Sequence, residues 1–64
     1  MPGRGVIFEF VRRGNIVRVA AVDEATGVEA WIIGPVSASQ ADLKTLARRK
    51  LDYVMKKKGL GRSD

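Results

Sequence analysis

Two short turn signals constrain the fold of this 64-residue chain more than any other feature of its sequence. Gly14-Asn15 separates two apolar, β-branched segments. A two-residue Gly-Asn loop is typical of an antiparallel hairpin, because both residues tolerate a positive φ. The second signal, residues 23–27, ends with Gly27, which can adopt the left-handed conformation that closes such a loop. The sequence therefore predicts a three-stranded antiparallel meander, with strands at about residues 5–13, 16–23 and 28–34.

The second half of the chain predicts a single amphipathic helix at about residues 39–58. Ser39 is a suitable N-cap, with Ser37 as an alternative, and Gly59 stands where helices commonly stop. Apolar residues recur at helical spacing and form one stripe along the helix. These residues are Leu43, Leu46, Ala47, Leu51, Val54 and Met55. The predicted fold class is therefore α+β, a three-stranded antiparallel meander followed by one C-terminal helix (βββα).

The chain is short, so we expect one domain over residues 1–64, with a small core and mobile ends at residues 1–4 and 59–64. A core of this size rarely contributes more than about 3–5 kcal/mol of stability without a disulfide, a metal or self-association. The chain has no cysteine and no histidine, so we expect no disulfide, no metal and no cofactor. Self-association is the remaining source of stability, and we expect a homodimer.

We expect the protein to be cytoplasmic. No stretch approaches the roughly 20 apolar residues of a membrane span, so no membrane is expected as a partner. The N-terminal residues also lack the apolar segment of a signal peptide. A chain without cysteine fits a reducing compartment.

The lengths of the two turns decide the strand register and therefore which side chains share a face of the sheet. A two-residue first loop pairs Phe10 with Val19, and a four-residue second loop pairs Ala21 with Ala30. One face is then wholly apolar at the middle of the sheet and is predicted to pack against the helix stripe. This face contains Val6, Phe8, Phe10, Val17, Val19, Ala21, Val28, Ala30 and Ile32.

The opposite face combines large apolar side chains with charged ones. Its large apolar members are Ile7, Val11, Ile16, Val22, Trp31 and Ile33. Among them stand two acids and two arginines, and Glu9 lies diagonal to Arg18, a position that predicts an exposed ion pair. A contiguous apolar patch rimmed by charge marks an interaction site, and tryptophan is enriched at the energetic centres of interfaces. We therefore predict that the protein self-associates through this face.

Two further routes to a dimer stay open. The edge strand that begins at Gly5 can pair with another chain through its free main-chain groups. Gly34 and Pro35, which separate the sheet from the helix, can also act as a hinge that exchanges the helix between two chains. The sequence does not choose among face packing, edge pairing and helix exchange.

The net charge of +5 comes entirely from the second half of the chain. Residues 1–35 carry four arginines and four acidic residues, whereas residues 36–64 carry eight basic and three acidic residues. Binding of nucleic-acid phosphates is therefore an alternative function of the helix. Its candidate residues are Lys44, Arg48, Arg49, Lys56 and Lys57. A solvated surface explains the same charges, and Tyr53, expected at the edge of the apolar stripe with its hydroxyl in water, offers little for base stacking.

We expect no enzymatic activity and assign no catalytic residue. Without histidine and cysteine, the commonest general base and the thiol nucleophile are missing. Ser37 and Ser39 have no evident base partner, and capping explains one of them. Glu9 and Glu29 with Arg18 between them fit a structural ion-pair network better than a catalytic site.

Four segments of the chain resemble a family of small proteobacterial proteins of unknown function. They are RRGN at residues 12–15, VDEATG at 22–27, GPVSAS at 34–39 and RRKLDYV at 48–54. The resemblance covers most of the chain and implies strands followed by one helix, in a dimer with or without exchange of a strand or helix. It implies no catalytic or binding residue. We predict a small non-enzymatic homodimeric interaction protein, with a nucleic-acid-binding protein that uses the basic helix face as the alternative.

Overall fold

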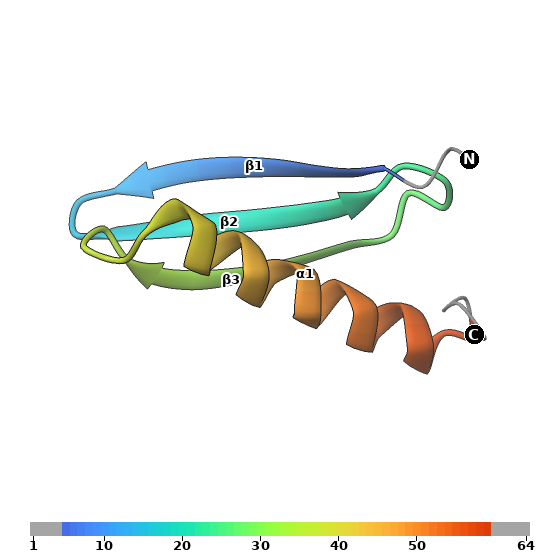
Figure 1. The fold of residues 1–64 in the computed structure, drawn as a ribbon. Helices are drawn as coiled ribbons and strands as arrows, with labels where there is room; N and C mark the ends of the chain where they lie inside the picture. The colour runs from blue at the N-terminus through green and yellow to red at the C-terminus, as the bar shows by residue number, and fades with distance from the viewer. Residues whose placement is uncertain (1–4, 60–64) are drawn as a thin grey trace.

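The computed structural model of the protein describes residues 5–59. The predicted mobile ends lie outside the described residues, except for Gly59 at the end of the helix. Three antiparallel strands are followed by one helix, so the predicted βββα fold is confirmed (Figure 1). The elements are β1 (Val6–Arg13), β2 (Ile16–Asp23), β3 (Glu29–Pro35) and α1 (Gln40–Lys57).

The strands form one sheet in the order β1-β2-β3, with β2 in the middle. Phe10 pairs with Val19 in the first ladder, and Ala21 pairs with Ala30 in the second. This register is the one that the two turn lengths predict. A shift of one residue would have moved every apolar row to the opposite face, so the assignment of side chains to faces follows from the turns.

In the first turn, only the glycine adopts the positive φ that both Gly14 and Asn15 would tolerate. Gly14 has a φ of 60°, and no residue other than glycine has a positive φ within residues 5–59. Positive φ at only the first central position is the mark of a type II′ turn, whose twist matches that of the flanking strands. Asn15 therefore does not need the left-handed conformation that it would tolerate.

The second turn is built around the buried Asp23. Its carboxylate oxygen Oδ2 accepts hydrogen bonds from both the backbone N–H and the hydroxyl of Thr26, each at 2.9 Å. Gly27 has a φ of 79° and donates its N–H to the carbonyl of Asp23 at 2.7 Å. The Thr26 hydroxyl also lies 3.7 Å from the sulfur of Met55 in α1. These contacts tie the loop to itself and to the C-terminal half of the helix.

The helix begins where the sequence predicts. The Ser39 hydroxyl accepts a hydrogen bond from the backbone N–H of Asp42 at 3.0 Å, so Ser39 and not Ser37 is the N-cap. At the other end, Lys58 is the C-cap and Gly59 follows with a φ of 76°. A left-handed glycine after the last turn is a common helix stop.

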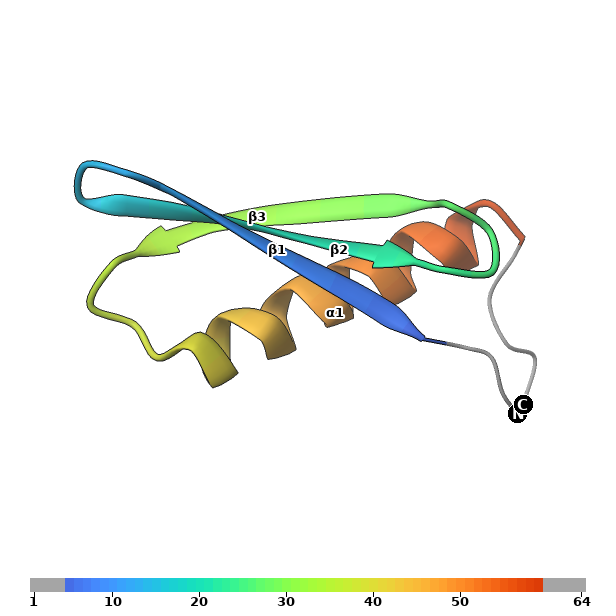
Figure 2. The same cartoon turned by 90° about the horizontal axis from the view of Figure 1, so that it is seen from above.

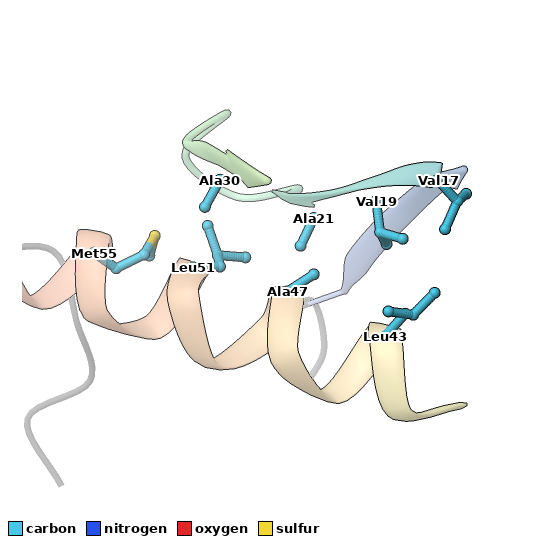
Figure 3. Close-up of a cluster of buried hydrophobic side chains, with 8 residues drawn as sticks. All are labelled: Val17, Val19, Ala21, Ala30, Leu43, Ala47, Leu51 and Met55. Carbon is cyan, nitrogen blue, oxygen red and sulfur yellow. The ribbon is translucent and has the colours of Figure 1, made fainter. Parts of the chain in front are cut away.

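The core lies between α1 and the face of the sheet that carries the wholly apolar row (Figures 1 and 2). Figure 3 shows side chains of β2 and β3 pointing toward the helix, which points its own stripe back at them. The buried cluster consists of Val17, Val19, Ala21, Ala30, Leu43, Ala47, Leu51 and Met55. One predicted member of the stripe was wrong. Leu46 is 50% exposed, so it lies at the edge of the stripe and outside the core.

The helix approaches β3 closely at a glycine. A Cβ atom built on Gly34 would lie 2.5 Å from Cδ2 of the buried Leu43. Gly34 does not have a positive φ, so the conformation itself does not require glycine. The lack of a side chain is what lets the first turn of α1 pack against the end of β3.

Candidate functional site

The outer face of the sheet, opposite the helix, carries a patch of large apolar side chains. We call it the outer patch, and it consists of Ile7, Val11, Ile16, Val22, Trp31 and Ile33. Five of these side chains are between 38% and 54% exposed, and Val22 is half-buried. The structure therefore brings the predicted self-association residues together on one face and leaves them uncovered within the single chain.

Trp31 lies on β3 between two cationic side chains. The guanidinium of Arg18 lies 5.1 Å from the centre of the indole ring, and the ammonium of Lys50 lies 5.4 Å from it. Lys50 also donates a hydrogen bond from Nζ to the main-chain carbonyl of Trp31 at 3.0 Å. Ala20, which pairs with Trp31 on the neighbouring strand, is only 2% exposed although it lies on this face. Larger neighbours thus cover the centre of the outer face.

The charges of the outer face separate toward its two ends. Glu9 and Glu29 lie in the half near the second turn, whereas Arg13 and Arg18 lie in the half near the Gly14 hairpin. The predicted ion pair between Glu9 and Arg18 was wrong. No salt bridge joins these two described residues, because Arg18 stacks over Trp31 instead. The face has no net charge but has an acidic end and a basic end.

The candidate nucleic-acid residues do not form a single basic face. Successive residues of a helix turn by about 100°. Lys44 and Arg48 therefore flank the apolar stripe on the side of β1, and Lys57 lies on the opposite flank. Arg49 and Lys56 point away from the sheet. All five side chains are exposed, on three sides of α1.

Two of these cations lie over aromatic rings. Lys44 Nζ lies 5.3 Å from the centre of the Phe8 ring, and Lys57 Nζ lies 5.7 Å from that of Tyr53. Tyr53 itself is 61% exposed and stands away from the core, so its predicted place at the edge of the core was wrong. Nucleic-acid binding by this helix stays a prediction.

The proposed hinge is held in place by hydrogen bonds. The N–H of Val36 donates to the carbonyl of Asn15 at 3.0 Å, and the N–H of Ala38 donates to the carbonyl of Pro35 at 3.1 Å. Gly34 packs against Leu43, as described above. Exchange of the helix between two chains would have to break these contacts in each chain, and it stays a prediction.

Residues 5–59 contain no group of acidic side chains placed to hold a metal ion. They also contain no buried side-chain nitrogen or oxygen without a hydrogen-bond partner. Such an orphaned polar atom is one sign of a site that waits for a ligand. The outer patch is therefore the candidate that the described part of the chain supports best.

Lys50 is the contact that sequence reasoning missed. Its position, three residues after Ala47 and seven after Leu43, places it at the border of the apolar stripe. That spacing signals a side chain close to the sheet. The strand that it meets depends on where the helix crosses the sheet, and local sequence does not encode this.

Residues 3–58 match the model of a family described as a domain of unknown function, DUF6898. The chain belongs to the DUF6898 family. This match confirms the predicted resemblance to a family of unknown function. Searches of curated proteins and of solved structures return no match to this chain. Within residues 5–59, no helix combines the length and the apolar character that spanning a bilayer requires.

Proposed function

We propose that this DUF6898 protein is a small non-enzymatic interaction protein that acts as a homodimer, and that two copies pack through their outer patches. The observation that carries this proposal is the exposure of five large apolar side chains on one face of the sheet. Monomeric proteins rarely leave a contiguous apolar patch open unless it is an interaction site. Tryptophan, which this face carries at position 31, is among the residue types most enriched at the energetic centres of interfaces.

The small core of the single chain supports the proposal. Among the fully buried side chains, the largest are Leu51 and Val19, and four of the nine buried apolar residues within residues 5–59 are alanines. Burial contributes in proportion to apolar area removed from water, so alanines add little. A second buried surface between two copies would add stability that the helix-covered face alone does not provide.

The charges of the outer face favour a particular self-pairing. A two-fold axis in the plane of the interface and perpendicular to the strands places the acidic end of one copy over the basic end of the other. Glu9 and Glu29 then approach the half of the partner that carries Arg13 and Arg18. An axis along the strands would instead gather four acids at one end and four arginines at the other. Charge complementarity of this kind selects orientation more than it adds affinity.

The size of the face sets the expected affinity. Three strands of up to eight residues, about 4.8 Å apart and rising about 3.3 Å per residue, give a flat area of about 370 Å². A standard interface buries about 800 Å² per partner. The proposed interface is therefore small, and we expect a dissociation constant in the micromolar range and a mass that depends on concentration.

Trp31→Glu is the variant that tests the proposal. It places a charge among the apolar side chains of the proposed interface and leaves the side chains between sheet and helix unchanged. Sedimentation equilibrium from about 1 to 500 µM, a range chosen to span a micromolar Kd, should show the wild-type chain rising from 7.0 kDa to twice that mass. Trp31→Glu should stay at 7.0 kDa throughout, with a far-UV spectrum close to that of the wild type.

Tyr53→Glu is the matched control, because it changes an exposed aromatic residue of α1 that lies outside the outer patch. This variant should dimerise like the wild type. A wild-type chain that stays at 7.0 kDa over the whole range would end the proposal. A Trp31→Glu variant that still dimerises would show that the interface lies elsewhere, for example in an exchanged helix.

A further inference from the structure

The two edges of the sheet differ in what they offer to another chain. In an antiparallel ladder, residues that bond to the neighbouring strand alternate with residues whose N–H and C=O point away from it. The N–H of Asp23, at the end of β2, donates to the carbonyl of Val28, so the even-numbered residues of β3 bond to β2. The main-chain groups of the odd-numbered residues, which include Trp31 and Pro35, therefore point away from β2. Lys50 occupies the Trp31 carbonyl, and Pro35 has no N–H. The edge of β3 is therefore partly blocked.

The edge of β1 carries no such block. Glu24 donates its N–H to the carbonyl of Gly5. Because bonding residues alternate along a strand, Gly5 and the odd-numbered residues of β1 direct their N–H and C=O groups toward β2. The outward-pointing residues are then Val6, Phe8, Phe10 and Arg12. No contact within residues 5–59 uses their outward main-chain groups. This edge is a row of free donors and acceptors, of the kind that accepts an added strand.

A groove lies beside the C-terminal half of this edge, on the side of the helix. The helix lies over β2 and β3 rather than over β1 (Figures 1 and 2). Phe8 and Phe10 are therefore only half-buried, although they share a face with the fully buried Val19. The groove has a volume of about 230 Å³. It is lined by Phe10, Arg12, Val17, Val36, Ala38, Gln40 and Leu43.

The charge of the groove indicates what kind of strand would fit. None of its lining residues is acidic, Arg12 lies in its wall, and Lys44 stands close by over the Phe8 ring. A second copy of β1 in this place would bring no carboxylate to the groove, because its side chains on this side include Arg12 and no acid, and it would add the cations of its own Arg12 and Lys44. An extended segment with apolar side chains and a carboxylate would instead complement both the apolar floor and the cations.

We propose that the free edge of β1 and the groove beside it bind an extended, acidic and apolar segment of another protein as a fourth, antiparallel strand. One apolar side chain of that segment enters the groove against Phe10, the next alternate side chain packs on the half-buried Phe8, and its carboxylate meets Arg12. The residues of the bound segment whose side chains face the groove lie opposite the residues of β1 whose main-chain groups point outward. The N–H and C=O groups of these segment residues therefore form the hydrogen bonds to β1. This inference does not depend on the outer patch, which lies on the opposite face of the sheet.

A defined peptide tests the proposal on the full chain. The probe is a blocked heptapeptide in which three valines alternate with three threonines and an aspartate stands at the end that reaches Arg12. Amide hydrogen exchange in the free protein should be fast at Phe8 and Phe10 and slow at Ile7 and Glu9. Added peptide should slow exchange at Phe8 and Phe10, and leave exchange at Trp31 and Ile33 unchanged.

Two matched peptides and two matched protein variants distinguish the proposed binding mode from non-specific association. N-methylation of the three valine amides removes the ladder donors and should weaken binding by more than about tenfold. N-methylation of the three threonine amides, which point away from β1, should leave binding within about twofold, since it removes no ladder bond. Arg12→Gln should weaken binding by about fivefold at low salt, whereas Arg13→Gln, on the other face, should not.

Three results would overturn the proposal. Protection at Trp31 or Ile33 would place the added strand at β3. Concentration-dependent protection of Phe8 and Phe10 without peptide would show that a second copy of the chain occupies this edge. Failure of the peptide to bind up to its solubility limit would show that the edge accepts no strand of this chemistry. A chain that proves monomeric would end the dimer proposal but would leave this one standing.

Discussion

The two faces of the sheet arise from the same alternation of side chains along the strands, but one face is buried and the other is largely exposed. On the helix-covered face, alternate residues such as Val19 and Ala21 are fully buried. On the outer face, larger apolar residues such as Ile7 and Ile33 are more than half exposed. Hydrophobicity alone does not distinguish the two faces. What differs is that the outer face also carries charged side chains, and that the helix covers only one side.

This difference shows how a short chain divides its apolar residues between folding and association. The face that is wholly apolar at its middle packs against the helix stripe and makes the fold. The face with an acidic end and a basic end keeps its apolar side chains in water in the single chain. Residues that stabilise the fold and residues that bind a partner therefore alternate along the same strands.

The largest test of this division uses two adjacent isoleucines of β3. Ile32 faces the helix and Ile33 faces away from it. Ile32→Glu should cost more than about 3 kcal/mol, because apolar burial is lost and a charge must be desolvated, and should unfold the chain. Ile33→Glu should change the stability of the monomer by less than about 1 kcal/mol and weaken only the dimer. Urea denaturation at low protein concentration measures both, and equal losses would contradict the assignment of faces.

A second test compares two leucines of α1. Leu51 is 1% exposed and Leu46 is 50% exposed. Leu51→Ala should reduce the free energy of unfolding by about 2–5 kcal/mol, because it leaves a cavity in the core. Leu46→Ala should change it by no more than about 0.5 kcal/mol. A large loss for Leu46→Ala would show that this side of the helix is also covered, as it would be in a helix-exchanged dimer.

A third test addresses how closely the helix approaches the covered face. Gly34→Ala should cost about 1–3 kcal/mol, because the new methyl group would overlap the buried Leu43 side chain. Combining it with Leu43→Ala should recover about 1 kcal/mol of that cost, since the two residues are in contact. Thermal unfolding of the two single variants and the double variant measures this coupling. Purely additive losses would show that the helix shifts freely to accommodate the methyl group.

The smallest expected effect concerns the cations around Trp31. Arg18→Gln removes one cation from the face of the indole and should cost about 0.5–1 kcal/mol. It should also change the fluorescence of Trp31. Arg13→Gln, on the same face but not over the ring, is the control. Identical spectra for the two variants would show that Arg18 does not rest on Trp31 in solution.

Much of this protein could be predicted from its sequence because the decisive signals are local. The pairing of Phe10 with Val19 depends only on the length of one loop, and the N-cap at Ser39 depends on the next three residues. The outer patch followed from the same register, since side chains on a strand alternate with a period of two. These features needed no knowledge of how the helix lies on the sheet.

Most of the features that could not be predicted depend on where the helix lies. The exposure of Leu46, the contact of Gly34 with Leu43 and the contact of Lys50 with Trp31 each require the position of α1 over β2 and β3. A helical period defines an apolar stripe but not the strands against which it packs. The sequence also predicted an ion pair between Arg18 and Glu9. A strand register shows which side chains are neighbours, but it does not decide whether an arginine pairs with a carboxylate or stacks on an aromatic ring.

The sequence by itself thus determined the order of the elements, the strand register and the composition of each face of the sheet. These follow from turn chemistry and from the alternation of side chains within a few residues. Only the tertiary structure decided that the helix leaves β1 partly uncovered and that Lys50 blocks the edge of β3. The reason is physical: the place of a helix on a sheet is set by close packing between side chains far apart in the chain.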